Sequence, residues 1–414
     1  MKCLLWIPVI LAYFPFVGGY PGTDLQPFFF ISAIAISVLF LNYFKFAVEV
    51  VIAFLVSIFF IILWAVLYLD SIDMNFLAVY LVAIFTMFFF YGFYGAVDVG
   101  LTKGCILLVA TVYAVVGAVQ LVIPDFMASL VQRSVEAALS FDATGRGVRS
   151  LTSEPSALGK VFTSLNVLYV FVSVWRRPKT GEGELLGVSL LFFLVSALLA
   201  RSAYALSMHL FLILILWSLL SFRTFVVAGV IAVASAMLFG TLLFLFAQQV
   251  EGVRALSLLV AISSDPDFVL SQGAMRKVFN IPITIDSLRF FGLAGSGNSG
   301  ESYFSSVWTP WGALDYEVRA RALGGFVEFL LRFGMFGLPI FILYAYFLFN
   351  VFRVKCFVNS KRVRVGIYFG VAVVVLSMQD SSPALPMSLL ILMVVNRKLG
   401  VDGVLVNPSG RVAV

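Results

Sequence analysis

The chain has 414 residues, of which 62% are hydrophobic and 12% are charged, and it carries a net charge of +6. An average soluble domain is about half apolar and about a quarter charged, so these proportions exclude a soluble globular protein, a disordered chain, a coiled coil and a nucleic-acid-binding protein. One histidine and three cysteines supply too few ligands for a multi-residue metal site or a disulfide scaffold. We therefore expect a membrane protein that uses no metal and no other cofactor.

Apolar runs along the chain predict the transmembrane helices. A helix needs about 20 mostly apolar residues to cross the hydrocarbon core of a bilayer, and twelve runs meet or nearly meet this length. They lie near residues 3–18, 27–44, 47–69, 75–95, 104–123, 160–175, 185–200, 202–220, 224–247, 335–352, 365–379 and 384–396. The predicted fold class is an all-α polytopic membrane protein with about 12 transmembrane helices.

Lysine and arginine residues predict the orientation, because short cytoplasmic loops retain them during insertion. With the N-terminus inside, 15 basic and 4 acidic residues lie on the cytoplasmic side, against 12 basic and 16 acidic residues outside. The predicted organisation is helices 1–5 in 1–123, an outer loop in 124–159, helices 6–9 in 160–247, a large outer loop in 248–334, and helices 10–12 with a cytoplasmic tail in 335–414. Long loops in a compact protein are usually functional, so we expect the site on the outer face.

Basic residues on the outer side are candidates for binding an anion. Several have an acidic residue nearby that can form a structural ion pair, as in the group Asp315, Glu317, Arg319 and Arg321, and in the pair Glu328 and Arg332. No acidic residue stands three or four positions away from Arg149, Arg201, Arg276 or Lys277. Guanidinium groups form forked hydrogen bonds with phosphate oxygens, so these four predict either a phosphate-bearing ligand or contact with lipid headgroups.

Arg201 is the clearest of these candidates. It follows Leu198, Leu199 and Ala200 directly, at the start of the eighth predicted helix. A short hairpin here would hold Arg201 at the outer edge of the membrane. His209 lies eight residues further on, about 12 Å deeper along the helix, where we expect a buried, hydrogen-bonded core histidine rather than a catalytic one.

Glu154 is the acidic residue that we single out in the first outer loop. It precedes Pro155, which fixes the backbone and can open the next helix. Its carboxylate is expected either to cap that helix or to act as a general base near the cations.

Four segments of the chain occur in a characteristic order: Arg149 to Gly159, Leu199-Ala200-Arg201-Ser202-Ala203, Arg289 to Gly300, and Gly324 to Leu338 at the return into the membrane. Together they resemble the motifs of Wzy-type O-antigen or exopolysaccharide polymerases and their O-antigen ligase relatives. The ligases carry a histidine just before the last segment, where this chain has Ala322-Leu323-Gly324-Gly325. The resemblance therefore favours the polymerase.

The resemblance implies a GT-C-like, metal-independent inverting glycosyltransferase in the bacterial inner membrane, with cytoplasmic termini and two large periplasmic loops. It would transfer a growing glycan from undecaprenyl pyrophosphate to the next lipid-linked repeat unit. The implied partners are that lipid-linked oligosaccharide, membrane lipids, and the chain-length regulator and flippase of the same pathway, but no nucleic acid.

Roles for individual residues follow from the resemblance and from the charge pattern. Glu154 is the expected base, with Glu317 and Glu328 as rivals, and Arg201 is the second expected catalytic residue. The expected binding residues for pyrophosphate and glycan are Arg149, Arg276, Lys277, Arg289, Arg319, Arg321 and Glu328.

Three other functions fit the same topology. The chain could be an O-antigen ligase acting on lipid A-core, a flippase or transporter of lipid-linked oligosaccharide, or a scaffold for chain-length regulators. A transporter usually has charges within its helices, whereas here only Glu49 and His209 are deeply placed ionisable candidates.

Overall fold

The computed structural model describes residues 7–18, 28–40, 48–67, 74–92, 102–124, 126–127, 130–131, 147–152, 155–176, 181–221, 226, 333–353 and 360–379. All regular secondary structure in these segments is helical. By length and composition, four of the described helices contain a stretch able to cross a membrane: Val50–Leu67, Lys103–Gln120, Ala157–Val174 and Glu182–Ala200. The chain is therefore an all-α, multi-pass membrane protein, as its composition predicts.

The described helices fall into three stretches of the sequence. The first contains α1 (Ile7–Tyr13), α2 (Phe28–Leu39), α3 (Val48–Leu67) and α4 (Met74–Gly92). The second contains α6 (Lys103–Gln120), α8 (Pro155–Arg176), α9 (Glu182–Ala200) and α10 (Ala203–Leu220). The third contains the short 3₁₀-helix η6 (Gly334–Gly337), α17 (Leu338–Arg353) and α18 (Ser360–Gln379).

Ten of the twelve predicted runs overlap one of these helices. The runs at 224–247 and 384–396 lie outside the described residues, apart from Val226. One boundary differs in a way that matters for the site, because α8 begins at Pro155 rather than near residue 160. Proline suits the first position of a helix, where its missing N–H group is not needed, so polar residues there extend the helix beyond its apolar run.

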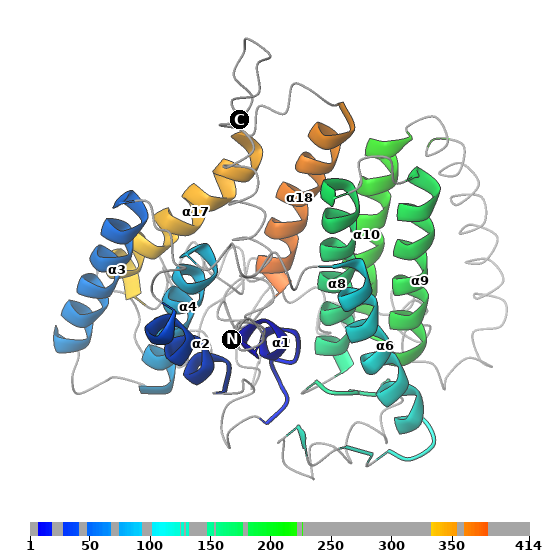
Figure 1. Ribbon diagram of the computed structural model, residues 1–414, viewed down its shortest axis with the longest axis horizontal. Helices are drawn as coiled ribbons and strands as arrows, with labels where there is room; N and C mark the ends of the chain where they lie inside the picture. Colours follow the sequence, from blue (N-terminus) through cyan, green and yellow to red (C-terminus); the bar gives the residue numbers. More distant parts are fainter. Residues whose placement is uncertain are drawn as a thin grey trace, which may run out of the picture.

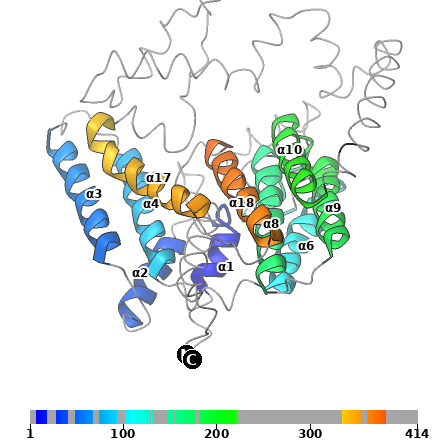
Figure 2. The same ribbon diagram turned by 90° about the horizontal axis from the view of Figure 1, so that it is seen from above.

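The helices form two groups. In the first, α6, α9, α10 and α18 all pack against α8 (Figures 1 and 2). The second group consists of α2, α3, α4 and α17, and α17 connects the two groups because it packs against α18 as well as against α3. Figure 1 shows α1 between the two groups. The bundle around α8 holds the candidate site.

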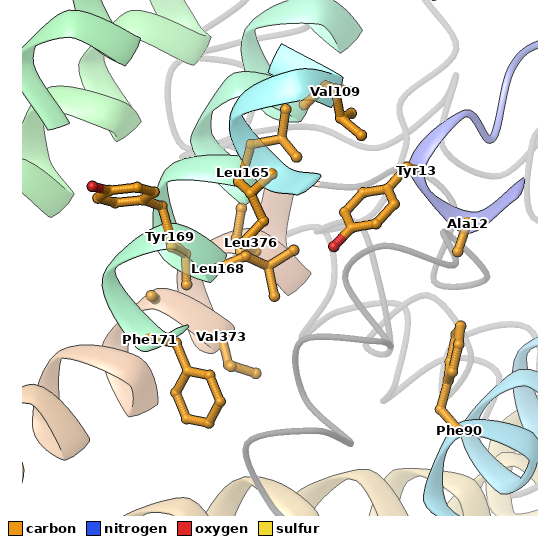
Figure 3. Close-up of a cluster of buried hydrophobic side chains, with 14 of the residues drawn as sticks. Ala12, Tyr13, Phe90, Val109, Leu165, Leu168, Tyr169, Phe171, Val373 and Leu376 are labelled. Carbon is orange, nitrogen blue, oxygen red and sulfur yellow. The ribbon is translucent and has the colours of Figure 1, made fainter. Parts of the chain in front are cut away.

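A shared hydrophobic core joins these helices. Figure 3 shows part of it, with side chains from five helices in one cluster: Val109 of α6, Leu165 and Leu168 of α8, Val373 and Leu376 of α18, Tyr13 of α1 and Phe90 of α4. Aromatic pairs extend the contacts, since Phe171 of α8 meets Phe369 of α18 edge to face, with their ring centroids 4.9 Å apart.

Exposure differs sharply between helices. The residues of α8 between Ala157 and Val174 are almost all buried, including the polar side chains of Thr163 and Asn166. In contrast, α3 exposes an apolar stripe at helical spacing, made of Ile52, Leu55, Phe59, Ile62 and Val66. An all-apolar stripe of this kind suits contact with lipid tails. Thus α8 is the interior helix of its group and α3 is peripheral.

Contacts between helix ends show which ends lie together. At one end of the bundle, Lys103 at the start of α6 forms an ion pair with Glu184 at the start of α9 (Nζ to Oε1, 2.6 Å). Tyr169 near the end of α8 donates its hydroxyl to the same carboxylate oxygen at 3.1 Å. Arg364, at the start of α18, donates to the carbonyl oxygen of Leu219 at the end of α10 at 3.2 Å. We call this end the Lys103 end.

Candidate functional site

The α9–α10 hairpin forms the centre of the candidate site, at the end of the bundle opposite the Lys103 end. The helices are joined by only Arg201 and Ser202, which confirms the short hairpin that the sequence predicts. Arg201 ends α9 rather than opening α10, because its backbone lies in the left-handed region (φ 46°, ψ 27°). Ser202 caps α10 by accepting a hydrogen bond from the backbone N–H of Ala205 at 3.5 Å.

The side chain of Arg201 is exposed at the turn, and its Nε donates to the carbonyl oxygen of Leu198 at 3.4 Å. This long, exposed hydrogen bond holds the guanidinium group weakly. Its other donors can therefore bind an anion that approaches along the membrane surface.

The loop predicted to lie outside binds directly to this hairpin through residues 147–152, which we call the arginine loop. The backbone N–H of Val148 donates to the carbonyl oxygen of Leu199 at 2.8 Å. Gly147 lies so close to Leu199 and Ala200 that an added Cβ would approach their backbone atoms to less than 3.0 Å. Only glycine fits there. Arg149 therefore directly follows Val148, whose main chain is hydrogen-bonded to the hairpin that carries Arg201.

The other side of the arginine loop is anchored to α6. Gln120, the last residue of α6, is buried; its Oε1 accepts from the backbone N–H of Ser150 at 2.7 Å and its Nε2 donates to the carbonyl oxygen of Ser150 at 3.2 Å. The Ser150 hydroxyl donates to the carbonyl oxygen of Tyr113 at 2.7 Å. Within the loop, the Thr152 hydroxyl donates to the carbonyl oxygen of Arg149 at 2.6 Å. The loop is thus fixed by both α6 and α9.

A third basic residue, Lys160, belongs to the same end of the bundle. It follows Gly159 in the second turn of α8, and its side chain is partly exposed. Gly159 itself lies against Ala205 of α10 and near Ser196 of α9. Sequence reasoning did not single out Lys160, because it stands at the edge of an apolar run. Like Arg149 and Arg201, it lies at the end of the bundle opposite the Lys103 end.

His209 lies deeper in the bundle, in a polar chain that links three helices. Ser189 of α9 donates to Oδ1 of Asn166 in α8 at 2.8 Å, and the amide nitrogen of Asn166 lies 3.2 Å from Nε2 of His209 in α10. All three side chains are buried, which confirms the expectation of a hydrogen-bonded core histidine. With the amide oriented this way, Nε2 accepts and the ring proton lies on Nδ1.

Charged groups are confined to the helix ends. Among the side chains that the structure describes, the buried polar ones are serine, threonine, asparagine, glutamine and histidine, and none is an aspartate, glutamate, lysine or arginine. The interior polar chain therefore serves as a structural link between helices, and binding of a charged ligand belongs to the ends.

The structure brings together two of the predicted site residues, Arg149 and Arg201. The remaining ones lie outside the described residues: Glu154, Arg276, Lys277, Arg289, Glu317, Arg319, Arg321 and Glu328. Besides Lys160, sequence reasoning missed Gln120 and Asn166. Each is a large polar side chain in an apolar helix, and this is the signal that could have identified them.

A comparison of the sequence with models of protein families and with curated proteins finds no match.

Proposed function

We propose that this chain is a Wzy-type polysaccharide polymerase, which joins undecaprenyl-pyrophosphate-linked repeat units of O-antigen or exopolysaccharide at the periplasmic face of the bacterial inner membrane. One observation carries the proposal: the arginine loop is bound to the α9–α10 hairpin through Val148 and Leu199. Two sequence motifs that resemble those of the polymerases, and that lie about 50 residues apart, therefore meet at one end of the bundle and present Arg149 and Arg201 there.

The proposed chemistry requires stabilisation of a leaving pyrophosphate. A hydroxyl group of the incoming repeat unit attacks the anomeric carbon of the glycan, and the bond from that carbon to the pyrophosphate oxygen breaks. The electron pair leaves with the lipid pyrophosphate, and the hydroxyl proton passes to a base. Cationic donors aimed at the departing oxygens lower the barrier because charge accumulates there. Arg149 and Arg201 take this role in the proposal.

Glu154 takes the role of the base. It follows the arginine loop in the sequence and directly precedes Pro155, the first residue of α8. A carboxylate needs to come within hydrogen-bonding reach of the acceptor hydroxyl to remove its proton. Because the pyrophosphate leaving group already supplies the activation, the reaction requires no nucleotide and no metal ion.

The position of Arg201 relative to the membrane supports its role in binding pyrophosphate. The lipid tail of the substrate is dissolved in the bilayer, so its pyrophosphate lies at the interface. Arg201 is exposed at a two-residue turn between two apolar helices, which is the depth at which such a group would arrive. A lipid-accessible cation therefore fits a lipid-linked anionic donor better than a soluble one.

The test is reconstitution of the purified protein in liposomes with undecaprenyl-pyrophosphate repeat units and a chelator, followed by separation of the products by size. We expect a ladder of lipid-linked polymer, and we expect Arg201→Glu to abolish it because a carboxylate repels pyrophosphate. Glu182→Lys is the matched control, since it reverses an exposed charge at the Lys103 end and should preserve the ladder.

Other outcomes would overturn the proposal. Transfer of glycan to lipid A-core without a ladder would identify a ligase. Movement of the lipid-linked oligosaccharide between leaflets without any product would identify a flippase. A normal ladder from the Arg201→Glu protein would remove the hairpin from the site.

A further inference from the structure

We propose that Gln120 is a positioning residue that fixes Arg149 in the candidate site. Gln120 belongs to the same site, and the effect that we expect on polymer synthesis rests on the proposed function. It concerns a side chain at the end of α6 that never needs to touch the substrate. The structural part of the proposal, that Gln120 fixes the arginine loop against the bundle, can be tested without any activity assay.

The argument begins with the hydrogen bonds of Gln120. Its amide group accepts from the N–H and donates to the C=O of the same residue, Ser150, and it also donates to the carbonyl oxygen of Phe126 at 2.9 Å. A side-chain amide that bonds to both main-chain groups of one residue replaces the partner that a neighbouring strand would provide. Gln120 thus connects α6 with two separate parts of the first outer loop.

The position of Ser150 in the chain makes this connection specific for Arg149. On one side of Arg149, Val148 is bonded to Leu199 of the hairpin; on the other side, Ser150 is bonded to Gln120 and to Tyr113. Arg149 is the only residue between these two anchors. Its Cα can therefore move little relative to the turn that carries Arg201.

The backbone of Ser150 indicates that this arrangement is imposed by its surroundings. Its φ angle is 52°, in the left-handed region that serine seldom adopts. Such a conformation persists where the surrounding contacts determine it, and here the contacts come from Gln120 and Tyr113. Without Gln120, the N–H group of Ser150 and the carbonyl groups of Ser150 and Phe126 would lose this hydrogen-bond partner. The loop would then move away from the bundle, because these groups would need hydrogen bonds to water instead.

The first experiment measures the position of the loop. In a variant without Cys3, Cys105 and Cys356, Arg149→Cys provides a single thiol whose rate of reaction with a membrane-impermeant maleimide is followed in proteoliposomes. Gln120→Met keeps the volume and removes the hydrogen bonds, and we expect it to raise the rate about tenfold, the factor that corresponds to one net buried hydrogen bond. An unchanged rate would overturn the proposal.

Two further variants make this result specific. Thr111→Val is the matched control, because it is an isosteric polar-to-apolar change on the exposed side of α6, where the hydroxyl donates to Leu107 in the same helix. It should leave the rate unchanged. If Gln120→Met does not assemble, Ser150→Ala removes only the hydrogen bond to Tyr113 and should raise the rate by a smaller factor; no increase would count against the proposal.

The second experiment separates positioning from a general effect on folding. In the polymer assay, Gln120→Met should lower kcat/KM, and it should lower it no further when Arg149 is already alanine. A mere loss of folded protein would lower activity by the same factor in both backgrounds, and that outcome would overturn the positioning role. If Arg149→Ala retains full activity, the proposed function of this site fails, whereas the labelling result stands on its own.

Discussion

Arg201 has a backbone conformation that suits glycine better than arginine. Among the described residues, three other than glycine have a positive φ angle, namely Met127, Ser150 and Arg201. Ser150 and Arg201 are linked through the arginine loop, and Met127 follows Phe126, which is bonded to Gln120. Backbone strain of this kind tends to be concentrated at functional sites, where the surrounding structure maintains it. All three residues belong to the end of the bundle where we propose the reaction.

The strain at Arg201 predicts that stability and activity can be separated. Arg201→Gly should raise the free energy of unfolding by about 1 kcal/mol, because a left-handed conformation costs an L-residue about that much and costs glycine little. The same variant should lose polymer synthesis. Thermal unfolding in detergent and the liposome assay measure the two effects, with Arg201→Lys as the variant that retains both strain and charge. A lower midpoint for Arg201→Gly would contradict this reading of the turn.

For single residues, the sequence identifies candidate charged site residues better than it identifies which residues are in contact. Arg149 and Arg201 could be selected because no acidic residue stands three or four positions away. Gln120 could be noticed as a polar residue in an apolar helix, but its pairing could not be predicted, since its partners include main-chain atoms of Ser150, 30 residues further along the chain. Nothing in the local sequence identifies such a pairing, because any residue at position 150 would offer the same N–H and C=O groups.

Close packing between helices depends on small residues. An added Cβ at Gly159 would come within 3.0 Å of the Cβ of Ala205, so α8 and α10 approach each other as closely as their backbones permit at this point. Helices in membranes gain much of their association energy from such contacts, because lipid gives no hydrophobic driving force between them. The contact also sets the distance from the start of α8 to the hairpin.

Gly159→Ala should therefore destabilise the protein by about 1–3 kcal/mol, the usual cost of overpacking. Gly187→Ala is the matched control in α9, where an added Cβ meets nothing within 4 Å. This control should be neutral or stabilising by up to about 1 kcal/mol, because alanine favours a helix more than glycine does. Thermal unfolding of both variants in the same detergent measures the difference in stability. Equal unfolding midpoints would mean that α8 can move away from α10 without loss of stability.

The interior polar chain provides a second link between elements. Asn166→Leu removes hydrogen bonds to both Ser189 and His209 at nearly constant volume. We expect a loss of about 1–2 kcal/mol, since buried partners are left unsatisfied but hydrogen bonds between membrane helices are individually modest. Ser218→Ala, whose hydroxyl donates within its own helix to Ile215, is the control. If both variants unfold at the wild-type temperature, the chain of polar groups does not hold the helices together.

Across the whole molecule, contacts between helix ends agree with an alternating path through the membrane. Lys103, Glu184 and Arg364 share one end, and Gln120, Ser150 and Arg201 share the other. With the predicted orientation, the first end is cytoplasmic. Val122→Cys, in a chain without its own cysteines, should then react with an impermeant maleimide added to spheroplasts, and Glu182→Cys should react only after lysis. The reverse pattern would invert the topology and move Arg201 to the cytoplasmic side.

The helices could be predicted far better than their arrangement. Apolar length identifies α3 and α9 without ambiguity, but it treats α8 as one span among many, although α8 is the interior helix. Polar residues that make α8 suitable for the interior, such as Asn166, lower its apolar character. The residues before the apolar run, from Pro155 to Gly159, are the part of α8 that the prediction leaves out. Partners such as Phe369 of α18 lie about 200 residues away, and no local pattern identifies them.

The enclosed position of α8 has a consequence for how the protein is made. Helices enter the membrane in the order of synthesis, so α8 is inserted before α9 and α10, and long before α18. Yet α18 packs against both α8 and α10. In a newly made chain, the surfaces of α8 and α10 that α18 covers must therefore stay uncovered until residues after Ser360 leave the ribosome. A chain that stops before α18 would keep these surfaces exposed to lipid.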